Sequence, residues 1–166
     1  MAVHEHKHRP GRPLKVGVIT VSDSRTEATD ASGKLIRDLL AGAGHDVSYY
    51  EIMPDEPRRI TEAVSLHRGA LDAIVLNGGT GISPRDQTYE AVKGLLDKEL
   101  DGFGELFRML SYQEIGSAAF LSRAIAGISG GKILVSLPGS PAACRLGMEK
   151  LLLPELGHMA NLLGLV

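Results

Sequence analysis

Two aspartates lie in loop-forming segments that follow short apolar runs. Asp55 follows DVSYYEIM in the segment PDEP, and Asp86 lies in LNGGTGISPRDQT, which follows DAIV. Mg²⁺ takes oxygen ligands and is usually held by one or two carboxylates together with substrate phosphates. Each aspartate alone could instead cap the helix expected to begin after it. Beside an anion-binding loop, the pair favours nucleotide chemistry.

The segment LNGGTGISPRDQT, residues 76–88, supplies such a loop. Its glycines permit positive φ angles and let backbone N–H groups approach an anion closely, although a tight turn would need the same residues. No Gly-Lys-Ser/Thr follows, so this is not a Walker A motif, and the GxGxxG spacing of a dinucleotide fold is absent. We expect the glycines both to turn the chain and to present N–H groups to phosphate.

Two further loops carry polar groups after apolar runs. The serines and the acid of SDSR, residues 22–25, could cap the next helix or bind a ligand. In LPGSP, Ser140 is expected as a helix N-cap with Pro141 at the first helical position, and the same helix start offers free N–H groups to phosphate. The candidate catalytic and metal-binding residues are Asp55 and Asp86; the candidate substrate-binding residues are Ser22, Asp23, Ser24, Gly78, Gly79, Thr80, Gly81, Thr88, Pro138, Gly139 and Ser140.

Alternating strand and helix patterns would bring these loops together. The strand patterns are 15–22, 46–53 and 72–76, and the helical patterns are 32–44, 57–70 and 88–97. Residues 101–124 are expected to be helical in two pieces. AIAGIS and KILVSL form an antiparallel pair across Gly130-Gly131, and a last helix from Pro141 is interrupted near Pro154. This order predicts a three-layer α/β/α fold whose mostly parallel sheet has one antiparallel edge pair, with ligands beyond the carboxyl ends of the strands.

Composition narrows the choice of partners. A chain of 166 residues with 43% apolar residues, a net charge of −2, 4% aromatic residues and no Trp suits one globular domain that does not bind nucleic acid. Cys144 is the only cysteine, which excludes an intramolecular disulfide and a multi-cysteine metal site. No apolar stretch reaches membrane-spanning length and the start lacks a signal-peptide core, so we expect no membrane partner and a cytoplasmic protein.

The first thirteen residues, MAVHEHKHRPGRP, are polar and contain two prolines. We expect a flexible arm over residues 1–13 and a single domain over residues 14–166. His4, His6 and His8 alternate within the arm, where nothing could hold them in a metal-coordination geometry.

Six segments occur in an order that resembles the MoaB/Mog family of molybdenum-cofactor biosynthesis. They are VITVSDSR, IMPDE, LNGGTGISPRDQT, DGFGELFR, LSRAIAG and LPGSPAA, and the resemblance runs from about Lys15 to the C-terminus. The length and the forms SPRDQT and LPGSPAA are most similar to the MoaB-type branch. The resemblance implies a molybdopterin-binding α/β fold that assembles as a trimer or, in MoaB-type members, a hexamer.

The resemblance also implies an activity. Active family members adenylylate molybdopterin: the terminal phosphate of the pterin attacks the α-phosphate of Mg-ATP, and the product serves the molybdate-insertion enzyme. The family's two important aspartates match Asp55 and Asp86, and its nucleotide-binding loops match residues 78–81 and 138–141. On this basis Asp86 would hold or orient Mg²⁺, and Asp55 would position Mg²⁺ or the attacking phosphate.

Two other hypotheses are open at this point. The same fold could bind or deliver molybdopterin without catalysis. A flavodoxin-like or NAD-type redox domain would instead be coloured, which a visible absorption spectrum would reveal. The segment GFGELFRML has more apolar residues than one helix stripe needs, which suits either a buried core or the expected homo-oligomer. A monomer in light scattering would contradict the oligomer.

Overall fold

The computed structural model describes residues 11–166, which form one six-stranded sheet in the order β2-β1-β3-β6-β5-β4. The strands are β1 (Lys15–Val21), β2 (Asp46–Met53), β3 (Ala73–Asn77), β4 (Lys98–Glu99), β5 (Ile125–Ser129) and β6 (Lys132–Leu137). The helices are α2 (Ala31–Gly42), α3 (Pro57–His67), α4 (Thr88–Leu95), α5 (Asp101–Ile115), the 3₁₀ helix η1 (Gly116–Leu121), α6 (Pro141–Gly147), the π-helical turn η2 (Met148–Leu152) and α7 (Leu153–Leu162).

The strand directions confirm the mostly parallel sheet. β1 is parallel to β2 and β3, and β3 is parallel to β6, so these four strands point their carboxyl ends the same way. β5 runs antiparallel to both β6 and β4. The turn between β5 and β6 is made by Gly130 and Gly131, with φ of 56° and 75°, as a two-residue hairpin turn requires. The short edge strand β4 was not predicted, because two charged residues carry no apolar pattern.

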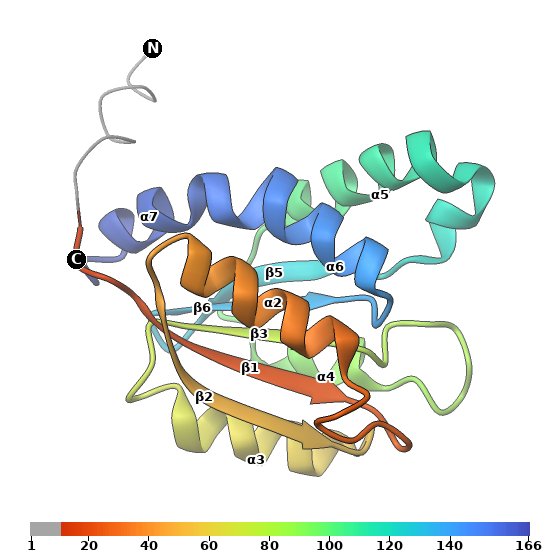
Figure 1. The fold of residues 1–166 in the computed structure, drawn as a ribbon, viewed down its shortest axis with the longest axis horizontal. Helices are drawn as coiled ribbons and strands as arrows, with labels where there is room; N and C mark the ends of the chain where they lie inside the picture. The colour runs from red at the N-terminus through yellow and green to blue at the C-terminus, as the bar shows by residue number, and fades with distance from the viewer. Residues whose placement is uncertain (1–10) are drawn as a thin grey trace.

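Helices cover both faces of the sheet (Figure 1). On one face α2, α5, α6 and α7 pack on side chains such as Val16, Val18 and Val135. On the other face α3 and α4 pack on Ile19, Ile74 and neighbouring residues. Alternate residues of the central strands point into these two cores, which accounts for their nearly uninterrupted apolar sequences. The three-layer α/β/α prediction is thereby confirmed.

The C-terminal helix and the GFGELFRML segment refine two expectations. The interruption of the last helix is the π-helical turn η2, which ends two residues before Pro154. Within α5, Phe107 is fully buried in the core, whereas Leu106 and Met109 are about half exposed. The segment therefore contributes both to the core and to the surface, and the expected homo-oligomer stays a prediction.

The expected N-terminal arm lies mostly outside the described residues, together with His4, His6 and His8. Within the described part, Arg12 forms two hydrogen bonds with Asp72, of 2.8 and 2.9 Å, and one with the carbonyl of Leu165. None of the helices within residues 11–166 combines the length and apolar character that crossing a bilayer requires. The division into an arm of residues 1–13 and a domain of residues 14–166 stays a prediction.

The contact between Arg12 and Asp72 predicts a pH-dependent contribution to stability. Asp72 is buried, which raises its pKa, but hydrogen bonds from Arg12 and from the Lys15 N–H outweigh burial and bring the pKa below its ordinary value. A lowered pKa stabilises the fold above the ordinary value of 3.8, and this contribution is lost as pH falls below it. Asp72→Asn should cost about 2 kcal/mol near neutral pH.

Chemical denaturation of wild type and Asp72→Asn, near neutral pH and below pH 3.8, measures this contribution. The difference between the two proteins should shrink in acid, because Asp72 is then protonated. A difference that is the same at both pH values would contradict the assignment.

Candidate active site at the carboxyl edge of the sheet

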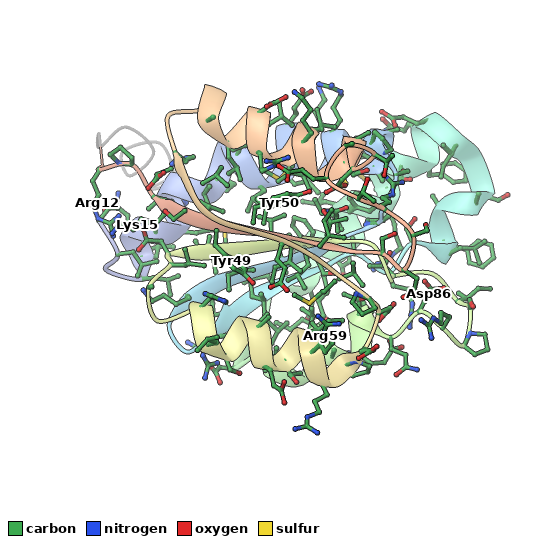
Figure 2. All side chains as sticks on the ribbon, turned by 60° about the horizontal axis from the view of Figure 1, so that its bottom comes forward. Arg12, Lys15, Tyr49, Tyr50, Arg59 and Asp86 are labelled. Atoms are coloured by element: carbon green, nitrogen blue, oxygen red, sulfur yellow. The ribbon has the colours of Figure 1, made fainter. Side chains whose placement is uncertain are left out.

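The loops after β1, β2, β3 and β6 meet at one edge of the sheet, as predicted. We call residues 22–25, 54–56, 78–87 and 138–140 the strand-end loops. The Ser22 N–H donates to Met53 O at 2.8 Å, and the Gly78 N–H donates to Leu137 O at 3.0 Å, so neighbouring loops are joined at their bases. Figure 2 shows Asp86 at this end of the molecule and Arg12 at the other.

Asp55 is the most buried carboxylate of the strand-end loops, with 8% of its surface exposed. Its Oδ2 accepts the Gln87 N–H at 3.1 Å, and its Oδ1 has no hydrogen-bond partner within residues 11–166. Burial raises its pKa against the effects of the Gln87 N–H and of the nearby Thr88 side chain, which lower it, and the carboxylates of Asp86 and Asp23 raise it further. The side chain does not cap α3, whose start has no side-chain cap, so the helix-cap alternative is wrong.

Thr88 Oγ1 lies close to the Asp55 carboxylate. The residue is fully buried at the start of α4, and its hydroxyl also lacks a hydrogen-bond partner within the described chain. A Cβ added to Gly79 would overlap both Thr88 Oγ1 and Asp55 Oδ2, well inside 3.0 Å. Gly79 has a φ of +66°, which L side chains rarely adopt. Asp55 and Thr88 thus line a buried polar recess that packs directly on the Gly79 backbone and has no room for a side chain at position 79.

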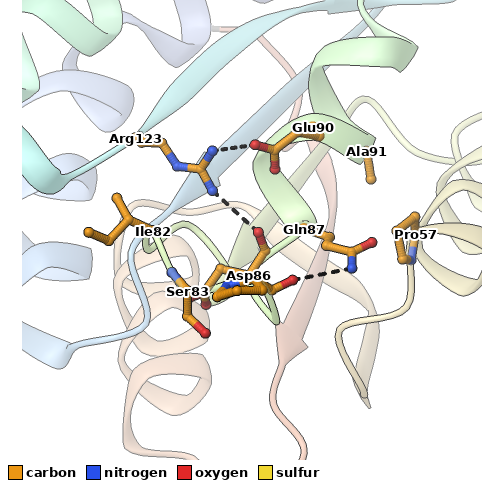
Figure 3. Close-up of a pocket in the computed structure, with 9 residues that line it drawn as sticks. Pro57, Ile82, Ser83, Asp86, Gln87, Glu90, Ala91 and Arg123 are labelled. Carbon is orange, nitrogen blue, oxygen red and sulfur yellow. Dashed lines mark hydrogen bonds and ion pairs between the residues drawn. The ribbon is translucent and has the colours of Figure 1, made fainter.

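Asp86 lies farther out, on the turn before α4. Its Oδ2 accepts the Ser83 N–H at 3.1 Å, and the N-cap position of α4 is Gln87, which makes no side-chain cap. The alternative that Asp86 caps the helix is therefore wrong as well. Asp86 also lines a hollow of about 660 Å³ on the outer side of the loop, together with Pro57, Ile82 and Arg123 (Figure 3). None of the other predicted site residues, Asp55 included, lines this hollow.

Arg123 holds the glycine-rich loop in place, and the sequence analysis did not single it out. Its guanidinium donates to Thr80 O at 3.0 Å and to Gly81 O at 2.5 Å. It also donates to Asp86 O at 3.4 Å and pairs with Glu90 on α4 (Figure 3). These contacts neutralise three carbonyl dipoles and fix the backbone that carries Asp86. The only signal for Arg123 in the sequence was its place in the motif LSRAIAG.

The glycine-rich loop also presents unused donors. No hydrogen bond within residues 11–166 uses the backbone N–H groups of residues 79–82. Their neighbours are engaged, since the Gly78 and Ser83 N–H groups both have acceptors. Backbone N–H groups without acceptors at a turn are suited to an anion. The loop thus serves as a turn and leaves these donors available, and their binding of phosphate stays a prediction.

The SDSR loop makes local contacts and one long-range contact. Ser22 Oγ accepts from the N–H groups of Ser24 and Arg25, so this hydroxyl closes its own turn rather than capping α2. Asp23 forms an ion pair with Arg85 of the glycine-rich loop, at 2.7 Å from its Oδ2 to the arginine Nε. That hydrogen bond lowers the pKa of Asp23. The ligand-binding roles of Ser22, Asp23 and Ser24 stay predictions.

The N-cap of α2 is Asp30, a residue that the sequence analysis left aside. It is buried and accepts the Gly33 N–H at 2.9 Å, the Thr20 hydroxyl at 2.6 Å and the Tyr50 hydroxyl at 2.7 Å. Burial raises the pKa of Tyr50 to about 12, and the hydrogen bond to Asp30 makes the second-largest contribution. Asn77 Nδ2 donates to Thr20 Oγ1 at 2.9 Å. This network ties β1, β2 and β3 to α2 directly beneath the strand-end loops.

The PGSP loop is fixed from below as well. Ser140 caps α6 by accepting the Ala143 N–H at 3.2 Å, with Pro141 at the first helical position, as predicted. Gly139 O accepts the Ser32 hydroxyl at 2.6 Å. The buried Cys144 thiol donates to Pro138 O at 3.1 Å, and burial raises its pKa to about 12, so it is not a reactive thiolate.

The oxygen ligands at this site fit Mg²⁺ only if a bound substrate adds its phosphate oxygens. Asp55 Oδ1 and Thr88 Oγ1 are oxygen atoms without partners, and Asp86 lies within electrostatic reach of Asp55. Within residues 11–166 no three His, Cys, Asp or Glu side chains are grouped so that they could hold a metal by themselves. Mg²⁺ is commonly bound through one or two carboxylates, with phosphate oxygens and waters completing the shell. Asp55 and Asp86 would supply the protein's carboxylates.

Fold and site together define a three-layer α/β protein whose carboxylates and free N–H groups meet at one sheet edge. A family model described as "Probable molybdopterin binding domain" matches residues 17–158. The molybdenum cofactor biosynthesis protein B of Bacillus cereus is 53% identical over 162 residues, covering 96% of each chain. The chain belongs to this molybdopterin-binding MoaB/Mog family.

Solved structures agree with this membership. A crystal structure of molybdenum cofactor biosynthesis protein B has a TM-score of 0.90 and 52% identity, covering 95% of this chain and 100% of that chain. The Mog protein of Mycobacterium ulcerans has a TM-score of 0.84 and 28% identity, covering 94% of this chain and 100% of that chain. The higher identity to protein B is in line with the predicted MoaB-type branch.

Proposed function

We propose that this protein acts in molybdenum-cofactor biosynthesis, where it binds molybdopterin and adenylylates it with Mg-ATP. The observation that carries the proposal is the recess at the carboxyl edge, where Asp55 Oδ1 and Thr88 Oγ1 are buried without partners beside the free N–H groups of residues 79–82. Family membership supplies the substrate class. The adenylylated pterin would pass to the molybdate-insertion enzyme.

The reaction needs little covalent chemistry from the protein. An oxygen of the pterin's terminal phosphate attacks the α-phosphorus of ATP, and the bond from that phosphorus to the bridging oxygen breaks, so that pyrophosphate leaves with the electron pair. Such transfers depend on positioning and charge neutralisation. Mg²⁺, when bound, would neutralise phosphate charge.

The chain's own residues divide this work between them. Free N–H groups of the glycine-rich loop would bind phosphate oxygens, and Asp55 and Asp86 would hold and orient the metal. Arg123 fixes the backbone of Gly81 and Asp86 through their carbonyls. No nucleophilic cysteine or general-base histidine is required by this scheme, which agrees with the buried thiol of Cys144.

Incubation of the purified protein with molybdopterin, ATP and Mg²⁺ tests the proposal, with pyrophosphate release and AMP attached to the pterin as the two readouts. Asp86→Asn should lower turnover by about 100-fold or more, because it removes a charge that acts on the transferring phosphate. Asp38→Asn is a suitable control, since Asp38 is exposed on α2 and pairs only with Lys34.

Three outcomes are informative. Full turnover in Asp86→Asn would refute the role of Asp86. Tight pterin binding without ATP-dependent pyrophosphate release, at every Mg²⁺ concentration, would favour the alternative of a non-catalytic molybdopterin-binding or delivery protein. Failure to bind the pterin at all would refute both functions.

A further inference from the structure

Arg85 joins two of the strand-end loops and leaves most of its hydrogen-bonding capacity unused. Its Nε donates to Asp23 Oδ2 at 2.7 Å, and this ion pair joins the glycine-rich loop to the SDSR loop. No other hydrogen bond of its guanidinium occurs within residues 11–166, so both NH₂ groups are free of protein acceptors. The side chain is 64% exposed and that of Asp23 is 42% exposed.

The backbone on both sides of Arg85 is held in place by Arg123. Arg123 holds Gly81 O and Asp86 O, the carbonyls on either side of the turn that carries Arg85. Arg123 itself is engaged with those carbonyls and with Glu90, so it has little capacity left for a ligand. Arg85 is the cation of this loop whose donors remain available, and the nearby charges of Asp23, Asp55 and Glu56 favour its protonated form.

We propose that Arg85 binds the pyrophosphate half of the nucleotide, and that Asp23 occupies its guanidinium until the nucleotide arrives. This inference rests on the proposed adenylyl transfer and deepens it. Asp55 lies at the buried end of the site, where the α-phosphate would meet the pterin, while Arg85 lies at the exposed end. The β- and γ-phosphates point outward in that arrangement and leave as pyrophosphate past Arg85.

The exchange of partners is energetically reasonable. An exposed arginine–carboxylate pair contributes about 0–1 kcal/mol, because water screens it and two side chains lose freedom. A phosphate accepts two parallel hydrogen bonds from a guanidinium fork, which roughly doubles the strength of a neutral bond. Asp23 is exposed enough to return to water when it is displaced. The ion pair therefore orients Arg85 without competing strongly with a phosphate.

Binding of inorganic pyrophosphate in the presence of Mg²⁺, followed by isothermal titration calorimetry without pterin, tests this inference separately from turnover. Arg85→Gln should weaken binding by about tenfold or more. Arg85→Lys should recover part of the loss, since it restores the charge but not the fork. Asp23→Asn should tighten binding by up to about fivefold, because it removes the competing carboxylate. The double variant Asp23→Asn/Arg85→Gln should lose that gain.

Arg58→Gln provides the matched control, because Arg58 makes the same 2.7 Å contact from its Nε but to Glu62 on the same helix. It should bind pyrophosphate as wild type does, and a thermal melt verifies that each variant is folded. Wild-type affinity in Arg85→Gln, weaker binding in Asp23→Asn, or no pyrophosphate binding by wild type would each overturn the inference. Arg85-dependent binding without formation of adenylylated pterin would refute the proposed transfer alone.

Discussion

Replacing Gly79 by alanine is expected to lower the free energy of unfolding by about 2–5 kcal/mol and to abolish ligand binding. Two costs add. A positive φ costs an L residue about 1–2 kcal/mol, and crowding in a packed region costs a further ~1–3 kcal/mol. The crowding arises because the new methyl group would overlap Thr88 Oγ1 and Asp55 Oδ2. The methyl group would also displace Asp55, the carboxylate that is proposed to hold Mg²⁺.

Gly164→Ala separates the two costs. Gly164 has a φ of +67°, nearly that of Gly79, and a Cβ there would meet nothing within 4 Å. Urea denaturation of the two variants should show a small loss for Gly164→Ala and a much larger one for Gly79→Ala. Adding Thr88→Ala to Gly79→Ala should recover part of the difference. Equal losses at the two glycines would contradict the packing of the recess.

Asp55→Asn is expected to lower turnover by about 100-fold or more while raising the melting temperature. The loss of turnover follows from removing a buried charge that would act on the transferring phosphate. The gain in stability follows from the raised pKa of Asp55, which has burial as its main cause. A raised pKa means that stability is complete below the ordinary value of 3.8 and is lost as pH rises through the pKa in the folded protein.

The amide suits the recess better than the charge in the unliganded protein. It can still accept the Gln87 N–H, and its NH₂ group can donate to the partnerless Thr88 Oγ1. Thermal melts near neutral pH measure the gain, which should vanish below pH 3.8. Asp72→Asn makes the same chemical change and should destabilise, because the pKa of Asp72 is lowered. A lower melting temperature for Asp55→Asn would refute the electrostatic account.

Much of the fold and of the site could be predicted because the signals were local. The short strand patterns predicted the bounds of β1, β2 and β3 to within one residue, and Ser140 with Pro141 marked the start of α6. Parallel strands share a carboxyl edge, so the strand patterns alone predict that Asp55 and Asp86 lie at the same edge of the sheet. For these features the sequence near a residue determines its position.

The residues that escaped prediction depend on contacts between distant segments. Arg123 binds carbonyls some forty residues earlier in the chain, with separations of 43 and 42 residues to Thr80 and Gly81. Asp30 resembles an ordinary helix cap in sequence, and only the fold places Thr20 and Tyr50 against it. Arg85 and Asp23 were each visible in motifs, but their pairing joins two loops 62 residues apart. Contacts to backbone carbonyls cannot be predicted from residue types, because every residue has such a carbonyl.

The reversed direction of β5 makes the two ends of the sheet unequal in how far they tolerate changes in chain length. β5 begins at the carboxyl edge, so Arg123, two residues before its start, lies at that edge and reaches the glycine-rich loop. An insertion just before β5 or in the glycine-rich loop would separate the Arg123 guanidinium from the carbonyl oxygens that it contacts. At the opposite edge, the turn at Gly130 and Gly131 is exposed and remote from the site. A tag or an added segment therefore belongs there.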